Sequence, residues 1–209
     1  MKLIHTIIFI FISMYSFSQI EAVTNEGKEV LLSENGTWTY KNDNDLNNSN
    51  VTTVNNKSFK KHEKSTFNVK LAKVPLGIYI NPLKWSFTKD VNNPDAEYFF
   101  QLKGEDLYAQ VITEKVIVPL ENLTNMALSN FLNAAPNAKI VEKEYRNVNG
   151  LNVIMMRMEV TTEGVDLVFT GYYYSDENGT SQLVTWTSKN LFDLYLEDME
   201  ILVNGLNKL

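Results

Sequence analysis

The stretch GYYYSDENGTSQLVTWTS, residues 171–188, places an Asn-Gly pair between two runs rich in aromatic and β-branched residues. Asn-Gly is the pair that most readily adopts the positive φ angles of a tight hairpin turn. The stretch therefore predicts a hairpin in which Asn178-Gly179 joins strand 165–174 to strand 181–187.

Side chains alternate along a strand, so this hairpin has two different faces. One face carries Val165, Leu167, Phe169, Gly171, Tyr173, Gln182, Val184 and Trp186. On it, we expect the missing side chain of Gly171 to leave room for the indole ring of Trp186. The opposite face mixes tyrosines with aliphatic residues and threonines.

The same pair recurs at Asn149-Gly150, between predicted strands 139–148 and 151–160. A two-residue turn places Val141 opposite Met158 and Glu142 opposite Arg157. One side of this second hairpin is apolar and the other is mixed.

The rest of the C-terminal region reads as further strands and two helices. Strand patterns cover residues 67–71, 78–87 with a break at Asn81-Pro82, 97–102 and 107–114. Apolar residues at helical spacing cover 120–134 and 190–206. The order predicts an α+β fold over residues 66–209, in which an antiparallel sheet is flanked by helices.

The first residues, 1–18, combine one lysine, an apolar run and a small-x-small ending at Ser18. This pattern is typical of a secretory signal peptide cleaved near Ser18, and the alternative is an uncleaved membrane anchor. In the following segment, 19–40, Asn35-Gly36 predicts a β-hairpin with Leu31 on the same face as Trp38. A lone hairpin is marginally stable in water, so we interpret it as a docking element.

Residues 41–65 are polar, rich in asparagine and almost without periodic apolar positions. Such a segment has too little apolar surface to offset the entropy of ordering, which predicts a flexible linker. Asp43, Asp45 and Asn47 stand at the alternate positions of a calcium loop, but the bidentate glutamate of such a loop is missing. We therefore expect no metal there.

The residue types exclude several chemistries. The chain has no cysteine, and its two histidines are His5 and His62, outside the predicted sheet domain. A Ser-His-Asp triad, a Cys-His pair and a His-ligated zinc site are therefore excluded in residues 66–209. The net charge is −6 and no basic cluster is interleaved with aromatic residues, which argues against nucleic acid as a partner.

Carboxylate chemistry remains as the alternative enzymatic hypothesis. The candidate pairs are Glu105-Asp106, Glu142 with Glu144, and Asp176-Glu177. Two carboxylates that converge in a cleft can hydrolyse a glycan or peptide of the cell envelope. Exposed acidic residues are common, however, so surface charge explains each pair more simply. We therefore expect that the protein is not an enzyme and that it uses no cofactor and no metal.

Without histidine or cysteine, recognition must use shape, aromatic surface and neutral hydrogen bonds. Tyr172 and Tyr174 supply rings and hydroxyls on the mixed face, beside Leu183 and Thr185. These four residues are the candidate binding site for a ligand or partner. The alternative is that a helix covers this face and both rings are core, because aromatic stripes on sheets usually pack.

The order of motifs resembles a known group. LGIYINPLKWSF, PLENLTNMALSNFL, NVNGLNV, the 171–188 hairpin and a final helix ending in NGL are similar to the PsbP-like and DcrB-like envelope proteins. That resemblance implies an αβα sandwich with an accessory or binding role outside the membrane. EGKEVLLSENGTWTY also resembles a short N-terminal motif of exported bacterial proteins. The expected function is thus a non-catalytic exported protein of a Gram-negative envelope, periplasmic or secreted, whose partner is an envelope protein, a glycan or a small ligand.

Overall fold

The computed structural model describes residues 20–23, 29–32, 38–40, 52–89 and 93–209. The predicted signal peptide and the possible calcium loop lie outside these residues. The main sheet consists of β4 (Thr53–Phe59), β10 (Lys139–Val148), β11 (Leu151–Thr162), β12 (Val165–Asp176), β13 (Gly179–Ser188), β9 (Tyr108–Glu114), β8 (Ala96–Leu102) and β7 (Trp85–Lys89), in that spatial order.

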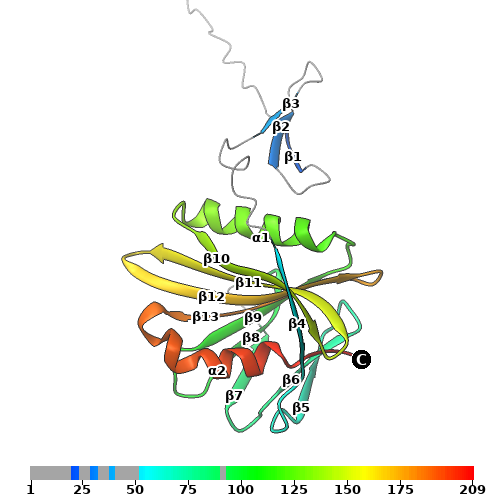
Figure 1. Cartoon of the computed structure of the whole chain (residues 1–209), viewed down its shortest axis with the longest axis vertical. Coiled ribbons are helices and arrows are strands. Elements are labelled where there is room, and N and C mark those ends of the chain that lie inside the picture. The colour runs from blue at the N-terminus through cyan, green and yellow to red at the C-terminus, as the bar shows by residue number, and fades with distance from the viewer. Residues whose placement is uncertain (1–19, 24–28, 33–37, 41–51, 90–92) are drawn as a thin grey trace, which may run out of the picture.

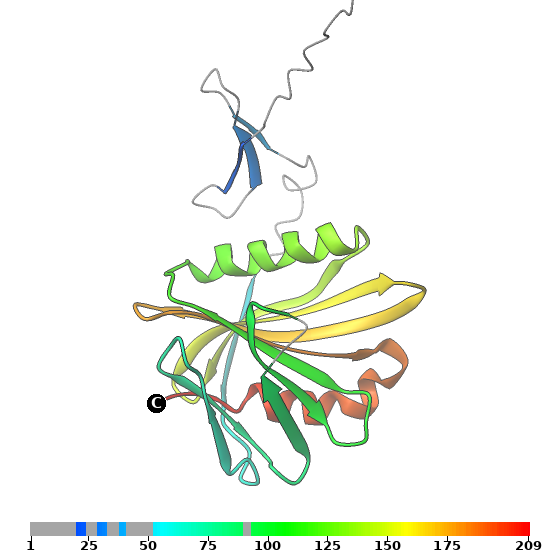
Figure 2. The ribbon, with the colours of Figure 1, turned by 180° about the vertical axis from the view of Figure 1, so that it is seen from behind.

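Two layers cover the two faces of the main sheet (Figure 1). Helix α1 (Leu120–Ala134) lies on one face. The other face carries α2 (Phe192–Val203), which follows a short 3-10 turn, and a small sheet ordered β14 (Leu206–Lys208), β6 (Leu76–Ile80) and β5 (Phe67–Lys70). Figure 2 shows β7 to β9 from behind. The predicted α+β sandwich is confirmed.

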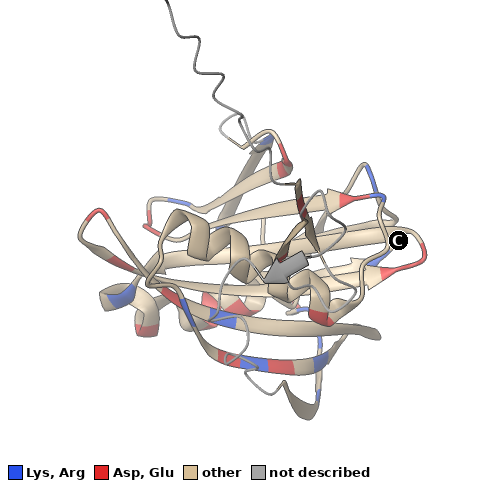
Figure 3. Cartoon of the chain, turned by 90° about the horizontal axis from the view of Figure 1, so that it is seen from above, with Lys and Arg blue, Asp and Glu red and all other residues tan. Residues whose placement is uncertain are grey.

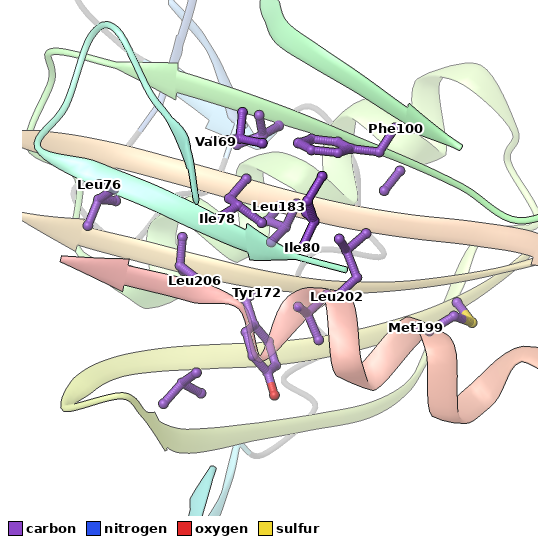
Figure 4. Packing of buried hydrophobic residues seen from close by; sticks show 14 of the residues in the cluster. Val69, Leu76, Ile78, Ile80, Phe100, Tyr172, Leu183, Met199, Leu202 and Leu206 are labelled. Atoms are coloured by element: carbon purple, nitrogen blue, oxygen red, sulfur yellow. The ribbon is translucent and has the colours of Figure 1, made fainter. Parts of the chain in front are cut away.

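The two cores follow from the alternation of side chains along the central strands. Under α1, Leu123 and Ala127 pack on Met156, Met158 and Tyr173. On the opposite face, α2 and β6 bury a larger cluster around Tyr172 and Leu183 (Figure 4). Burying one such side chain fully contributes about 1.5–3 kcal/mol, so both faces of β11 to β13 stabilise the fold.

The first long hairpin forms as predicted near its turn. Asn149 and Gly150 have φ values of 51° and 84°, and the pairing from Val148–Leu151 to Glu142–Arg157 has the expected register. Beyond that point the register shifts, so that Ile140, and not Val141, lies opposite Met158. Val141 is 46% exposed, because the extra residue of the irregularity leaves the paired ladder.

The second hairpin turns one residue earlier than predicted. Asp176 pairs with Gly179, so Glu177 and Asn178 form the turn. The register therefore moves by two residues, which leaves every side chain on its predicted face. Gly171 consequently lies opposite Val184, and Trp186 lies opposite Phe169. The expected contact between Gly171 and the indole is wrong.

The predicted N-terminal strands pair as a hairpin, but the face that they were predicted to share needs correction. Strands β2 (Glu29–Leu32) and β3 (Trp38–Tyr40) are antiparallel neighbours, and β1 (Ile20–Val23) pairs with the other edge of β2 to complete a three-stranded sheet. In it Leu31 lies opposite Thr39, and Leu32 lies opposite Trp38. Five residues separate Leu32 from its partner Trp38, whereas the prediction assumed a loop with an even number of residues. The register therefore differs by one residue, and the prediction that Leu31 and Trp38 share a face is wrong.

The predicted linker 41–65 is wrong for its second half, because β4 lies within it. β4 is parallel to β10, which makes the main sheet mixed and not purely antiparallel. Most of its residues are exposed, so its sequence lacks the apolar alternation by which strands are recognised. Pairing with β10 at the edge of the main sheet orders it.

Asn149 joins three parts of the fold at the tip of the first hairpin. Its side-chain oxygen accepts a hydrogen bond from the backbone N–H of Lys61 at 2.9 Å. Its Nδ2 donates to the carbonyls of Asn204, at 2.8 Å, and Leu206, at 2.7 Å. The turn thereby holds the chain that follows β4 and the chain that follows α2.

Asn149→Gly should lower the free energy of unfolding by about 3 kcal/mol. Glycine keeps the positive φ but removes three hydrogen bonds, each with a net contribution of about 1 kcal/mol. Urea denaturation measures this loss. Asn178→Gly is the matched control, because the side chain of Asn178 bonds only to neighbouring Asp176. Equal stability losses in the two variants would contradict the role given to Asn149.

Gly171→Ala should destabilise the protein by about 1–3 kcal/mol through overpacking. A Cβ atom at this position would lie 2.9 Å from Val184 Cγ2 and 3.2 Å from the carbonyl oxygen of Leu183. Val184→Ala removes the first contact, so the double variant should lose at least about 0.5 kcal/mol less than the sum of the single losses. Strict additivity in thermal or urea melts would show that the crowding is absent.

Candidate functional site

The structure places the four predicted site residues in the core. Tyr172, Leu183 and Thr185 have no exposed surface and Tyr174 is 7% exposed. Helix α2 and strand β6 cover this mixed face. This agrees with the alternative interpretation, in which a helix covers the face and both tyrosine rings belong to the core. The prediction of an open binding surface at these residues is therefore corrected, because the face is needed to complete the larger core.

The hydroxyl of Tyr172 is used inside the protein. It accepts a hydrogen bond from Arg146 at 3.1 Å and donates one to Asn204 Oδ1 at 2.7 Å. Arg146 in turn forms an ion pair with Glu144, with 2.5 Å between Nε and Oε1. Its guanidinium also lies 4.4 Å from the centre of the Phe59 ring. This buried network links β4, β10, β12 and the end of α2.

A hollow of about 450 Å³ lies beside β4, on residues outside the predicted site. Its lining consists of residues 54–58 of β4, Leu120 at the start of α1, residues 145–147 of β10 and Asn152 of β11. We call the part contributed by β10 and β11 the floor. Its size is within the range of small-ligand sites, about 300–1,000 Å³. This hollow is the candidate functional site.

The hollow results from an irregularity in the pairing of β4 with β10. Val54 pairs with Tyr145, but the next pair joins Ser58 to Asn147. Residues 55–57 therefore stand opposite the single residue Arg146, and the extra backbone must leave the ladder. Asn55 fixes this shape, because its Nδ2 donates to Glu144 and its Oδ1 accepts from the backbone N–H of Lys57.

Two asparagines form a pair on the floor of the hollow. Asn147 and Asn152 lie opposite each other across β10 and β11, and Asn147 Nδ2 donates to Asn152 Oδ1 at 3.2 Å. An amide group has one acceptor oxygen and two donor hydrogens. The pair therefore keeps capacity both to accept and to donate, and both residues are exposed.

The adjoining wall is fixed by Glu121 of α1. Its carboxylate accepts hydrogen bonds from Lys143 Nζ at 2.5 Å and from the Tyr145 hydroxyl at 2.9 Å. Burial acts to raise the pKa of Glu121, but the hydrogen bonds from Lys143, Thr52 and Tyr145 outweigh it and hold that pKa below its ordinary value. The ring of Tyr145 is thus held in place at the floor.

The candidate catalytic carboxylates are held by cations or tyrosines. Glu142 lies 2.5 Å from Arg157, Glu144 forms its ion pair with Arg146, and Tyr195 donates to Glu105 at 2.6 Å. Lysine 208 and the hydroxyl of Tyr174 both contact Asp176. Over the described ranges, no three histidine or acidic side chains are grouped as a metal would require.

The face under α1 also carries a row of partly buried rings, Phe131, Phe169, Trp186, Tyr108 and Phe99. Successive ring centres lie 4.7–6.0 Å apart. The Phe169 and Trp186 rings are stacked at 25°, so they turn their faces toward each other. The rings of this row contact one another, whereas the hollow has polar groups that remain available to a ligand. The hollow is therefore the better candidate for a binding site.

The charges do not define a site of one sign. In the ribbon seen from above, the positions of lysine and arginine are interspersed with those of acidic residues (Figure 3). Lys57 and Arg146 are the charged residues of the hollow's described lining, and Arg146 is paired with Glu144. The hollow therefore favours recognition by neutral hydrogen bonds.

Together these layers define an α+β sandwich of PsbP-like fold. The cyanobacterial PsbP (CyanoP) from Synechocystis sp. PCC 6803 superposes with a TM-score of 0.54 at 11% identity, over 71% of this chain and 95% of that one. LpqN of Mycobacterium tuberculosis, described as involved in cell envelope biogenesis, gives 0.46 at 10% identity, over 68% and 88%. No family model and no curated protein matches the sequence. The comparison establishes the fold.

Neither described helix is long and apolar enough to cross a bilayer. Of the residues that build the hollow, sequence reasoning missed the stretch 54–58 and the asparagines at 147 and 152. The sequence does carry a signal for the two asparagines. Asn147 lies two residues before Asn149 and Asn152 lies two residues after Gly150, so a tight turn places them near each other, and both are exposed. The sequence of β4 carries little strand signal, because Thr53, Val54 and Phe59 are its β-branched or aromatic residues and the residues between them are polar.

Stability should fall as the pH rises from about 10 to 12, and Tyr172→Phe should make this fall shallower. Burial raises the pKa of Tyr172 to about 12, although Arg146 acts in the opposite direction. The folded state then holds a proton that the unfolded state releases near pH 10, so the stabilisation is complete below pH 10 and is lost toward pH 12. Urea melts across this range test it. An unchanged pH slope in the variant would refute it.

Proposed function

We propose that this chain is a non-catalytic exported protein of the cell envelope that binds a ligand in the hollow beside β4. The observation that carries the proposal is the hollow itself, whose floor combines a fixed tyrosine ring with an exposed amide pair. Fixed polar groups in a concave surface lose little freedom when a ligand binds, which favours affinity.

Export is supported by the sequence. Residues 1–18 have the pattern of a signal peptide. The periplasm of a Gram-negative cell, or the medium, is the proposed location. The small N-terminal sheet β1–β3 is proposed to serve as a docking element for an envelope partner.

A binding role accounts for the polar groups better than hydrolysis does. General acid catalysis needs a carboxyl group whose pKa is raised, whereas hydrogen bonds hold the pKa of Glu121 and Asp176 below the ordinary value against the opposing effect of burial. Glu142 and Glu144 are held in ion pairs with Arg157 and Arg146. Carboxylate-dependent hydrolysis therefore remains the weaker alternative.

The test is co-sedimentation of the purified mature chain with isolated envelope material from the native host. We expect the parent chain to be retained, and Asn152→Trp to lose at least tenfold in retention because the indole would fill the hollow. Asn133→Trp, at an exposed position of α1 away from the hollow, is the matched control. Equal retention of all three proteins would refute the hollow as the site.

A further inference from the structure

We infer that the hollow recognises a neutral sugar unit of a glycan through two neighbouring hydroxyl groups. This inference rests on the proposed function and specifies its ligand. It follows from the polar groups of the floor, from the charge of the lining and from the shape of β4.

The amide pair matches the hydrogen-bonding pattern of adjacent hydroxyls. The bond from Asn147 Nδ2 to Asn152 Oδ1 leaves Asn147 Oδ1 as an acceptor and Asn152 Nδ2 as a donor, side by side on neighbouring strands. A hydroxyl group both donates and accepts, so one of two neighbouring hydroxyls donates to Asn147 and the other accepts from Asn152. Exchanging the oxygen and nitrogen positions of both amides leaves the same complementarity.

The remaining lining suits the other surfaces of a sugar ring. Val54 and Leu120 offer apolar contact, and the ring of Tyr145 is fixed because its hydroxyl is bound to Glu121. Asn56 and Ser58 add neutral polar groups on the β4 side, and both are exposed. A sugar combines C–H faces with hydroxyl edges, which such a mixed lining can contact together.

The charge of the lining disfavours an anionic ligand. Lys57 is its exposed cation, whereas Glu144 neutralises Arg146 and Glu121 neutralises Lys143 behind the floor. Phosphate and carboxylate ligands are usually held by several cations or by a bidentate arginine. The side chain of Arg146 is only 6% exposed, so its guanidinium cannot serve in that way.

The shape of β4 disfavours an extended peptide. A peptide that adds to a sheet needs a regular edge with evenly spaced backbone groups. Residues 55–57 interrupt that regularity, because they stand opposite one residue of β10. A bulge of this kind protects an edge from pairing with another strand.

The test is titration of the mature chain with neutral oligosaccharides, monitored by protein NMR shifts and calorimetry. The probes are a neutral hexa-oligosaccharide of glucose, a chitin hexamer, a polyanionic heparin fragment and a neutral peptide of similar length. We expect at least one neutral oligosaccharide to bind and to shift the amide signals of Asn147 and Asn152. Asn147→Ala with Asn152→Ala should weaken that binding at least tenfold.

Asn133→Ala is the matched control, and it should bind like the parent. The double variant changes only exposed side chains, and its urea midpoint shows whether the fold is kept. Binding of the heparin fragment or the peptide alone would overturn the sugar assignment. If no oligosaccharide binds but retention on envelope material still depends on Asn152, the sugar inference fails and the proposed function stands. If retention is also independent of the hollow, both fail.

Discussion

The strict alternation of side chains along β11, β12 and β13 is the constraint on which the structure depends. These strands are buried on both faces, with Met156 and Tyr173 under α1 and Met155 and Tyr172 under α2. A shift of one residue in any of their pairings would exchange the two cores. Because both layers are apolar, the middle of β11, Val153-Ile154-Met155-Met156, is apolar without interruption.

That constraint explains how far the fold could be predicted. The bounds of α1 and the positions of the three central strands were predicted from periodicity and Asn-Gly pairs. The Asn178 turn lies one residue earlier than predicted, but the resulting register shift of two residues left all faces unchanged. The register shift did change the residue opposite Gly171. The exact pairing depends on the local geometry of the turn, which the pattern of burial does not determine. The irregularity at Val141 had no sequence signal, since the chain there is polar and apolar in turn as in a regular strand.

The candidate site was less predictable for a physical reason. Tyr172 and Tyr174 drew attention because aromatic hydroxyls can recognise ligands, but burial on a sheet gives the same sequence pattern. The hollow depends on β4, whose residues are mostly exposed and therefore look like a linker. β4 is held by its pairing with the sheet edge and by side-chain hydrogen bonds such as that from Asn55 to Glu144. These interactions need no apolar alternation, so the sequence of β4 shows no periodic pattern.

The pairing of β4 with β10 has a consequence for the order of assembly. Asn55 and Glu144 are 89 residues apart in the chain, so closing this contact costs more loop entropy than forming either long hairpin. Contacts of such separation form late in folding. The hollow beside β4 is therefore incomplete until the chain has been made as far as Asn152 and β4 has joined β10. If the hollow is the ligand site that we propose, binding depends on one of the last long-range contacts to form.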